Sequence, residues 1–265
     1  MGTLIDGKKI AGERAELLRK KIQSLTPKKV CFILFGSDPR SLAFIKMKEK
    51  VAKDIGVKTV VIQKEVSTTE QAVRIVTEAT LEGYDGIVVQ LPLPKGIDEV
   101  SVLGVLPQEL DIDILVPSDI ENKTLPPVAR AVSWALDANN IRLGQNNIVI
   151  LGAGRLVGAP VAKWLTNAGY IVAVVDEQTP DHEKISLIYS ADIIISGIGV
   201  PHYIKPEMIK DGVVLIDAGT SESAGKLVGD IDPACYKKSS FYTPVPGGIG
   251  PMTVVALFEN LLNLD

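Results

Sequence analysis

The sequence predicts an α/β protein with two domains. Short runs rich in Val and Ile recur along the chain, and amphipathic stretches with apolar residues at helical spacing lie between them. Continuous apolar strands separated by helices are typical of parallel sheets that are covered on both faces. The length of 265 residues, at about 150 residues per domain, favours two such domains.

The elements follow in order from this pattern. Strands are predicted at 30–36, 57–63, 86–92, 147–154, 171–176, 191–197 and 213–219, and helices at 42–56, 69–83 and 157–169. A segment rich in Gly and Pro, 243–253, leads into a last helix that begins at Thr253. The stretch 106–130 interrupts the alternation because it is rich in Pro and Asp and poor in strand-forming residues. It is the predicted domain junction.

Composition excludes several classes of protein. The net charge is −4 without a long block of one sign, which argues against a nucleic-acid partner. Cys31 and Cys235 are the only cysteines and there are two His, so neither a disulfide framework nor a metal site is predicted. No run approaches the roughly 18 apolar residues of a membrane span, and the N-terminus has no signal-peptide core. We expect a cytoplasmic protein without a membrane partner.

The run NIVILGAGRLVG places Gly152, Gly154 and Gly158 between a strand and a helix. In dinucleotide-binding loops the first glycine makes a sharp turn, the second lets a pyrophosphate approach the backbone, and the third permits close helix packing. The spacing GxGxxxG is one residue longer than the usual pattern. A purely structural glycine turn remains an alternative.

Two further features support a cofactor site in the second half. Asp176 ends the next predicted strand, where a carboxylate can accept hydrogen bonds from an adenosine ribose. An ordinary cap is the alternative for this residue. The turn SGIGVP, with Gly197 and Gly199, follows another strand at the sheet edge where such folds bind cofactors.

Taken together, the motifs resemble those of the methylenetetrahydrofolate dehydrogenase/cyclohydrolase family. The segments that carry the resemblance span residues 41 to 253 and occur in the family's order: Ser41-x-x-Phe44-x-x-x-Lys48, VVQLPLPKGID (88–98), GAGRLVGAP (152–160), ADIIISGIGVP (191–201), VVLIDAGT (213–220) and PVPGGIGPMT (244–253). The last of these is the most specific.

The resemblance implies two α/β domains, the second a Rossmann-type doubly wound parallel sheet, with a folate cleft between them. The first would comprise residues 1–122, completed by the C-terminal helix 250–265, and the second residues 123–249. It further implies oxidation of 5,10-methylenetetrahydrofolate with NAD or NADP, hydrolysis of the methenyl product to 10-formyltetrahydrofolate, and a homodimer.

Catalytic roles are carried over to three residues. Phe44 and Lys48 share one helix face, so an aromatic ring can stack on a pterin beside an ammonium, although an isolated pair of this kind is more often structural. Gln90 is a polar residue in an apolar run and needs a partner. In the family the matching residue helps hold the lysine and the substrate. Asp113 matches the aspartate that grips the pterin, and it shares one side with Asp111 if the segment is extended.

The remaining candidates come from the same motifs. The glycines of GGIGPMT let backbone approach a ligand, and a proline suits the first turn of the following helix. The substrate-binding candidates are Phe44, Pro92, Gly247, Gly248, Pro251 and Thr253. The cofactor-binding candidates are Gly152, Gly154, Arg155, Gly158, Asp176, Gly197 and Gly199.

Departures from the family pattern shape two expectations. Ala153-Gly154 and Asp176-Glu177 replace the usual Arg-Ser and His-Ser, and carboxylates repel a 2′-phosphate, so NAD is preferred over NADP. Phe44 replaces the usual Tyr, while Leu110 and Ile114 replace a lysine and a glycine, so the hydrolysis is expected to be weakened. The alternatives are a monofunctional dehydrogenase and a non-catalytic folate- or dinucleotide-binding relative.

Overall fold

The computed structural model describes residues 2–115, 124–223 and 225–263, which form two compact units. The six-stranded unit comprises Met1–Ala11 and Val128–Thr253, and the three-stranded unit comprises Gly12–Pro127 and Val254–Asp265. The three boundaries fall inside helices α1 (Gly7–Gln23), α5 (Pro127–Ala138) and α8 (Ile249–Asn263). Each unit is therefore built from separate stretches of the chain. The predicted division at residue 122 stays a prediction.

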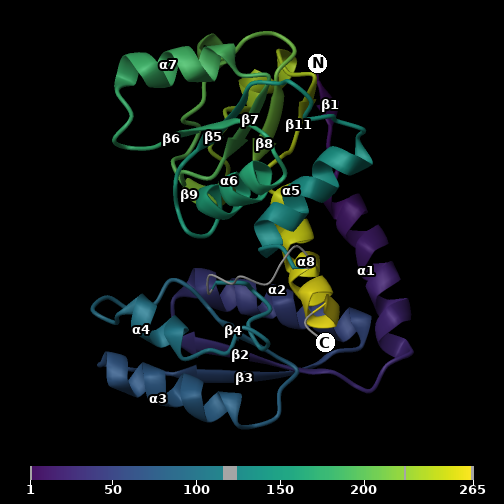
Figure 1. Ribbon diagram of the computed structural model, residues 1–265, viewed down its shortest axis with the longest axis vertical. Coiled ribbons are helices and arrows are strands. Elements are labelled where there is room, and N and C mark those ends of the chain that lie inside the picture. Colours follow the sequence, from purple (N-terminus) through teal and green to yellow (C-terminus); the bar gives the residue numbers. More distant parts are fainter. Residues whose placement is uncertain (1, 116–123, 224, 264–265) are drawn as a thin grey trace. The chain divides into compact units, whose positions relative to one another are not determined.

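The six-stranded unit contains one parallel sheet in the order β1-β11-β8-β7-β5-β6 (Figure 1). All of its strand pairs are parallel. The strands are β1 (Thr3–Leu4), β5 (Ile148–Leu151), β6 (Val172–Val175), β7 (Ile193–Ser196), β8 (Val214–Asp217) and β11 (Phe241–Tyr242). In chain order, the five strands from the second half of the sequence form a 2-1-3-4-5 doubly wound sheet, so the α/β prediction is confirmed.

The strand order of this sheet reverses between β5 and β7. From β5 the chain first goes to β6 on one side and then returns to β7 on the other. In open parallel sheets the crevice for a ligand lies outside the carboxyl ends of the two strands at such a switch point. The segments that follow β5 and β7 begin with Gly152 and Gly197. The fold thus brings both predicted glycine loops to the carboxyl ends of two neighbouring strands.

Helices and two short strands complete this unit. Helix α6 packs against β5 and β6, and the two-stranded antiparallel pair β9-β10 follows β8. The elements are α5 (Pro127–Ala138), α6 (Gly158–Asn167), α7 (Asp181–Ser190), β9 (Ser221–Ser223), β10 (Lys226–Val228) and the 3₁₀ helices η1 (Pro206–Met208) and η2 (Pro233–Lys237). The core contains aliphatic side chains of the strands, including Val149, Leu151, Ile194 and Leu215, all at most 2% exposed.

The three-stranded unit has a parallel sheet in the order β3-β2-β4. Its elements are β2 (Lys29–Phe35), α2 (Pro39–Ile55), β3 (Lys58–Lys64), α3 (Thr69–Thr80), β4 (Gly86–Val89) and α4 (Glu99–Gly104). Six of the seven residues of β2 are buried, as expected for a central strand. Helix α2 begins where Asp38 accepts a hydrogen bond from the Ser41 amide, and it ends at Gly56 with φ +88°.

The seven predicted strands and the predicted helices are present, with shifted ends. The last helix begins at Ile249, four residues earlier than expected, and the strand predicted at 86–92 ends at Val89. Helices α1, α4, α5 and α7 were not predicted. Of the predicted junction, 116–123 lies outside the described residues.

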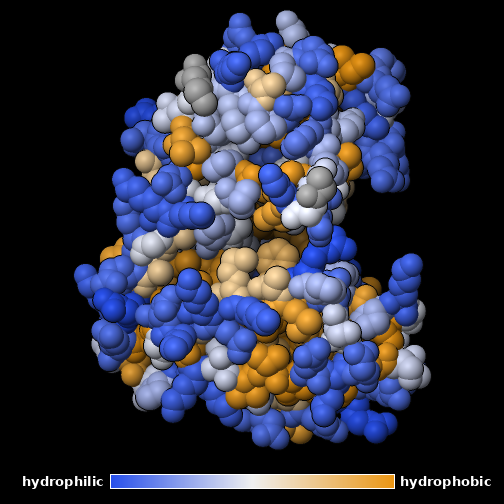
Figure 2. Space-filling view, turned by 180° about the vertical axis from the view of Figure 1, so that it is seen from behind, coloured by the Kyte–Doolittle hydropathy of each residue, from blue (hydrophilic) through white to orange (hydrophobic). Residues whose placement is uncertain are grey.

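On the face that Figure 2 shows, most of the surface is hydrophilic, and hydrophobic residues are exposed in smaller areas. No helix among the described residues is long and apolar enough to cross a membrane.

Candidate active site

The centre of the candidate site in the three-stranded unit is the ammonium group of Lys48. Its Nζ donates to Oε1 of Gln90 at 3.1 Å and lies 3.4 Å from Oδ2 of Asp113. Lys48 is 8% exposed and Gln90 9%. The structure thus brings together the three residues predicted to be catalytic, although they are far apart in sequence. A buried ammonium needs such partners because its desolvation is otherwise costly.

The positions of Lys48 and Gln90 follow from the elements that carry them. Lys48 lies on the buried face of α2, together with Ile45 and Ala52. Gln90 follows β4 directly, and its backbone amide donates to the Ile33 carbonyl at 2.8 Å, so pairing with β2 continues past the last strand residue. The next peptide bond, Leu91-Pro92, is cis.

Asp113 lies in a turn, which corrects the expectation of an extended segment. Ile114 N donates to the Asp111 carbonyl at 3.3 Å, so the two carboxylates do not follow a strand alternation. Asp111 is buried at 1% exposure, whereas Asp113 is partly exposed beside Lys48. Ile114 has φ +53°. It occupies the position where the family has glycine, and a β-branched residue is strained in this conformation.

Asn260 is a residue of this neighbourhood that the sequence analysis missed. Its Nδ2 donates to the Ile112 carbonyl and to the Leu125 carbonyl, both at 3.0 Å. The side chain is completely buried on α8. An amide next to Glu259 in the largely apolar run VVALFENLL was the signal that could have identified it, because a buried polar group needs partners.

The substrate-binding candidates are divided between the two units. Phe44 is half-buried one helical turn before Lys48, and Pro92 is exposed. In the six-stranded unit, Gly247 has φ +106°. A Cβ on Gly248 would come within 2.5 Å of the Pro244 carbonyl oxygen. Pro251 lies in the first turn of α8, as expected, and the Thr253 hydroxyl donates to the Ile249 carbonyl at 3.1 Å.

The first glycine loop has the geometry expected of each glycine. Gly152 has φ +97°, which suits a sharp turn. A Cβ on Gly158 would lie 1.7 Å from the Gly152 carbonyl oxygen, so α6 can begin this close to the loop only with glycine. A Cβ on Gly154 would meet no atom within 4 Å. Gly154 and Arg155 are both exposed, and the binding of a pyrophosphate at this turn stays a prediction.

Asp176 makes its visible hydrogen bonds within its own turn. Its Oδ1 accepts from the amide of Gln178 at 2.9 Å and from the amide and hydroxyl of Thr179, both at 3.1 Å. Oδ1 of Asp176 therefore acts as an ordinary cap of its turn, which was the alternative to a cofactor-binding role. The role of Asp176 toward a ribose stays a prediction.

The second glycine loop rests on buried carboxylates that the sequence analysis did not single out. Gly199 has φ +71° and open space around it, whereas a Cβ on Gly197 would come within 2.2 Å of Val157. Asp230 accepts hydrogen bonds from the amides of Ile198 and Val200 at 2.8 and 3.0 Å. Asp217 lies next to it in the same buried cluster, and burial raises the pKa of its carboxyl to about 7.

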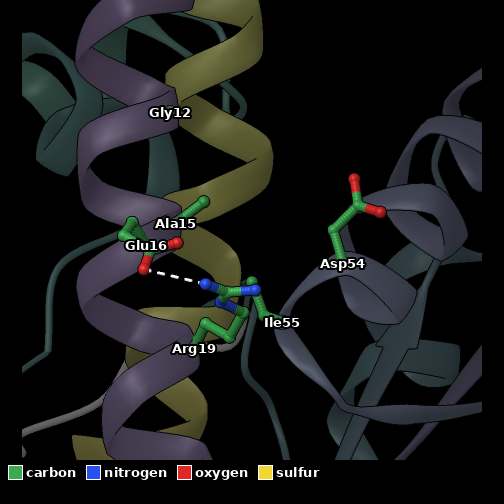
Figure 3. Close-up of a pocket in the computed structure, with 6 residues that line it drawn as sticks. All are labelled: Gly12, Ala15, Glu16, Arg19, Asp54 and Ile55. Atoms are coloured by element: carbon green, nitrogen blue, oxygen red, sulfur yellow. Dashed lines mark hydrogen bonds and ion pairs between the residues drawn. The ribbon is translucent and has the colours of Figure 1, made fainter.

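A pocket of about 290 Å³ lies elsewhere in the three-stranded unit, between helices α1 and α2 (Figure 3). It is lined by Gly12, Ala15, Glu16, Arg19, Asp54 and Ile55. Arg19 donates to Glu16 at 2.9 Å across one helical turn. None of the predicted site residues lines this pocket. Among the described residues, no cluster of three or more His, Cys, Asp or Glu could hold a metal ion.

Both parts of the chain match models of one protein family. Residues 5–113 match the tetrahydrofolate dehydrogenase/cyclohydrolase catalytic domain, and residues 126–265 match the NAD(P)-binding domain of the same family. The bifunctional protein FolD of Aquifex aeolicus is 36% identical over 99% of this chain and 94% of its own length.

Solved structures agree with this comparison. The bifunctional FolD methylenetetrahydrofolate dehydrogenase/cyclohydrolase of Campylobacter jejuni is 34% identical and superposes with a TM-score of 0.93, covering 100% of this chain and 98% of that one. The Trypanosoma brucei enzyme, solved with NADP and an inhibitor, is 30% identical with a TM-score of 0.92, covering 99% and 97%. The chain therefore belongs to the tetrahydrofolate dehydrogenase/cyclohydrolase family.

Proposed function

We propose that this protein oxidises 5,10-methylenetetrahydrofolate to the methenyl form and hydrolyses that product to 10-formyltetrahydrofolate. The observation that carries the proposal is the Lys48 ammonium held by Gln90 and Asp113, in the part of the chain that matches the family's catalytic domain. The two glycine loops after β5 and β7 supply the second requirement, a cofactor crevice.

The oxidation needs alignment more than acid or base chemistry, because the folate nitrogens stabilise the methenyl cation themselves. A bound nicotinamide cofactor supplies the hydride acceptor. Gly152, Gly154 and Gly158 would hold its pyrophosphate, and Gly197 and Gly199 would lie along the other side of the crevice. Phe44 would stack on the pterin ring and Asp113 would bind its polar edge, so that the reacting carbon is fixed.

The hydrolysis needs proton transfer, and Lys48 is the residue we assign to it. Water adds to the methenyl carbon and loses one proton, which leaves a hydroxyl on that carbon. The carbon-nitrogen bond to one folate nitrogen then breaks as the hydroxyl loses its proton and that nitrogen gains one, so one proton is released overall. Lys48 would manage these protons, and Gln90 would keep its nitrogen at the reacting carbon. The Phe44 ring offers no hydroxyl, so this step is expected to be weaker than with tyrosine.

A monofunctional dehydrogenase is the second candidate, and the observation that favours it is Phe44 in place of a hydroxyl-bearing residue. The two candidates differ only in the hydrolysis. A non-catalytic folate- or dinucleotide-binding relative is disfavoured, because the chain keeps Lys48, Gln90 and Asp113 in mutual contact.

For the cofactor, we propose a preference for NAD over NADP. Asp176 and Glu177 place two carboxylates after β6, and these would repel a 2′-phosphate. The Trypanosoma brucei relative was solved with NADP, and Arg155 is the residue of this chain that could attract the same phosphate. Asp176→Ser should therefore raise kcat/KM for NADP, whereas native kcat/KM values that favour NADP would refute the preference.

One assay tests the function as a whole. Purified protein is mixed with methylenetetrahydrofolate and either NAD or NADP, and methenyl absorbance is followed as it rises and then decays. A rise with one cofactor supports the dehydrogenase, and decay faster than without protein supports the hydrolysis. No rise with either cofactor would refute the proposal.

We also propose a homodimer, formed in the cytoplasm, in which strand β6 is the contact. This strand is at one edge of the sheet, and among the described strands it pairs with β5 alone. Ile171 is 92% exposed and Val174 37%, and an open edge with apolar side chains is a surface for pairing with another strand. Ile171→Asp combined with Val174→Lys should halve the mass measured by light scattering. Cell fractionation tests the location.

A further inference from the structure

Two buried carboxylates in the six-stranded unit have no part in the function proposed above. Asp217 is the last residue of β8 and is 1% exposed, and Asp230, two residues after β10, is fully buried. Burying charged groups is unfavourable unless each oxygen is paired. The hydrogen bonds of the two side chains therefore indicate what they stabilise.

Asp230 binds one short segment of the chain with both oxygens. Its Oδ2 accepts from the Ser196 hydroxyl and from the Ile198 amide, both at 2.8 Å, and its Oδ1 accepts from the Val200 amide at 3.0 Å. All three donors lie within 196–200, the second glycine loop. Hydrogen bonds to a carboxylate are among the stronger ones in proteins, so this side chain fixes the loop's backbone.

Asp217 fixes Asp230 in turn. Its Oδ1 accepts from the Gly219 amide at 2.9 Å and from the Asp230 amide at 3.2 Å, and its Oδ2 accepts from the Ile231 amide at 2.9 Å. The backbone of residue 230 and that of its successor are thus both bound to β8. The sheet is connected to the glycine loop through two carboxylates in series.

Two glycines leave the space that this arrangement needs. A Cβ on Gly219 would lie 2.2 Å from the carboxyl carbon of Asp230, and a Cβ on Gly229 would lie 2.1 Å from Oδ2 of Asp217. Within the loop, a Cβ on Gly199 would meet nothing within 4 Å. The loop is therefore held by buried carboxylates and has open space at Gly199.

We propose that Asp230 is a positioning residue for the nicotinamide cofactor, and that Asp217 supports it. This proposal rests on the proposed function, because it takes the crevice between the two glycine loops as the cofactor site. The first loop receives the pyrophosphate, so the second, across the switch point, receives the part of the cofactor beyond it. A loop fixed before binding loses less conformational entropy when the cofactor arrives, which strengthens binding.

The test measures cofactor binding and folate chemistry separately. Asp230→Asn keeps the size of the side chain but places an NH₂ group against donors. We expect the Kd for the preferred cofactor, measured by calorimetry, to rise at least tenfold. The rate of methenyl hydrolysis should stay within twofold, because that step uses Lys48 and no cofactor. The matched control is Asp232→Asn, which removes a partly exposed carboxylate two residues later, paired with Lys205 at 2.9 Å.

A milder variant covers the case in which Asp230→Asn does not fold. Ser196→Ala removes one of the three hydrogen bonds and should raise the Kd about threefold with hydrolysis unchanged. If folded Asp230→Asn, or Ser196→Ala in its place, keeps the native Kd within a factor of 1.5, the positioning role is wrong while the proposed function stands. Native protein that binds neither NAD nor NADP would overturn both.

Discussion

The ammonium of Lys48 donates to Oε1 of Gln90 at 3.1 Å, while the amide nitrogen of that glutamine donates to the Leu91 carbonyl at 2.6 Å. The second bond fixes which way the amide faces, because only its nitrogen can donate to a carbonyl. The oxygen is therefore directed at the lysine. A neutral amide oxygen held in this way restrains the ammonium and leaves its charge in place. A carboxylate at the same position would neutralise that charge.

Replacing Lys48 by Met should reduce methenyl hydrolysis to the uncatalysed rate, because Met keeps the apolar length of the side chain and removes the proton carrier. The decay of methenyl absorbance measures this. Lys50→Met is the matched control, since Lys50 is exposed on the same helix. Hydrolysis by Lys48→Met at the native rate would contradict the assigned role.

Replacing Phe44 by Tyr should raise hydrolysis roughly threefold to tenfold, the value of about one hydrogen bond made in the transition state. The ring keeps its stacking surface, so the KM for the folate should change little. Phe44→Leu is the comparison that removes stacking without adding a hydroxyl, and it should raise the KM instead. Equal hydrolysis rates for the native protein and the Phe44→Tyr variant would show that the hydroxyl has no part in the reaction.

Replacing Gly154 by Leu should raise the cofactor KM at least tenfold and leave the melting temperature nearly unchanged. The fold has room for this side chain, because a Cβ there meets no atom within 4 Å, whereas a bound pyrophosphate would meet it. Gly104→Leu is the control at an equally open position in the other unit. Native cofactor binding by Gly154→Leu would remove this loop from the site.

The free energy of unfolding should contain a contribution from Asp217 that decreases as the pH rises. Burial raises the pKa of this carboxyl from 3.8 to about 7. The folded state therefore holds a proton that the unfolded state releases, so the contribution is complete below about pH 4 and is lost as the pH passes through about 7. Asp217→Asn should flatten this part of the profile in urea titrations at several pH values. An identical slope in the variant would contradict the assignment.

At position 114, Gly should give a more stable protein than Ala, by about 1 kcal/mol, which is the reverse of the usual order. Ile114 has φ +53°, a conformation that suits glycine and strains any residue with a Cβ. Both variants lose the same side chain beyond Cβ, so their difference in denaturant midpoint isolates the backbone effect. A more stable Ala variant would show that the turn relaxes.

The sequence predicted the strands and the catalytic cluster because each leaves a local trace. A continuous apolar run such as VCFILF must be buried, and Gln90 stands out as a polar group in another such run. Helix α1 was missed since its sequence, GKKIAGERAELLRKKIQ, is dominated by charges and has few apolar positions. The turn at Asp113 was missed because Ile114 carries no turn signal.

The carboxylates behind the second glycine loop show a different limit of prediction from sequence. Asp217 belongs to VVLIDAGT, which carries the resemblance, and Asp230 lies between that segment and the next one, but their partners lie on other strands and loops. A single sequence does not reveal such pairings. Their burial could have been inferred only once the sheet order placed β7 beside β8.

The pairing of β1 with β11 has a consequence for the order of folding during synthesis. Thr3 and Leu4 pair with Phe241 and Tyr242, so a strand near residue 3 cannot complete its pairing until β11, about 240 residues later in the chain, has been synthesised. Contacts between residues so far apart in sequence form slowly. The three-stranded unit likewise includes residues from Val254 onward. Expression of either half as one continuous fragment should therefore give an incomplete sheet or an uncovered core, which is prone to aggregate.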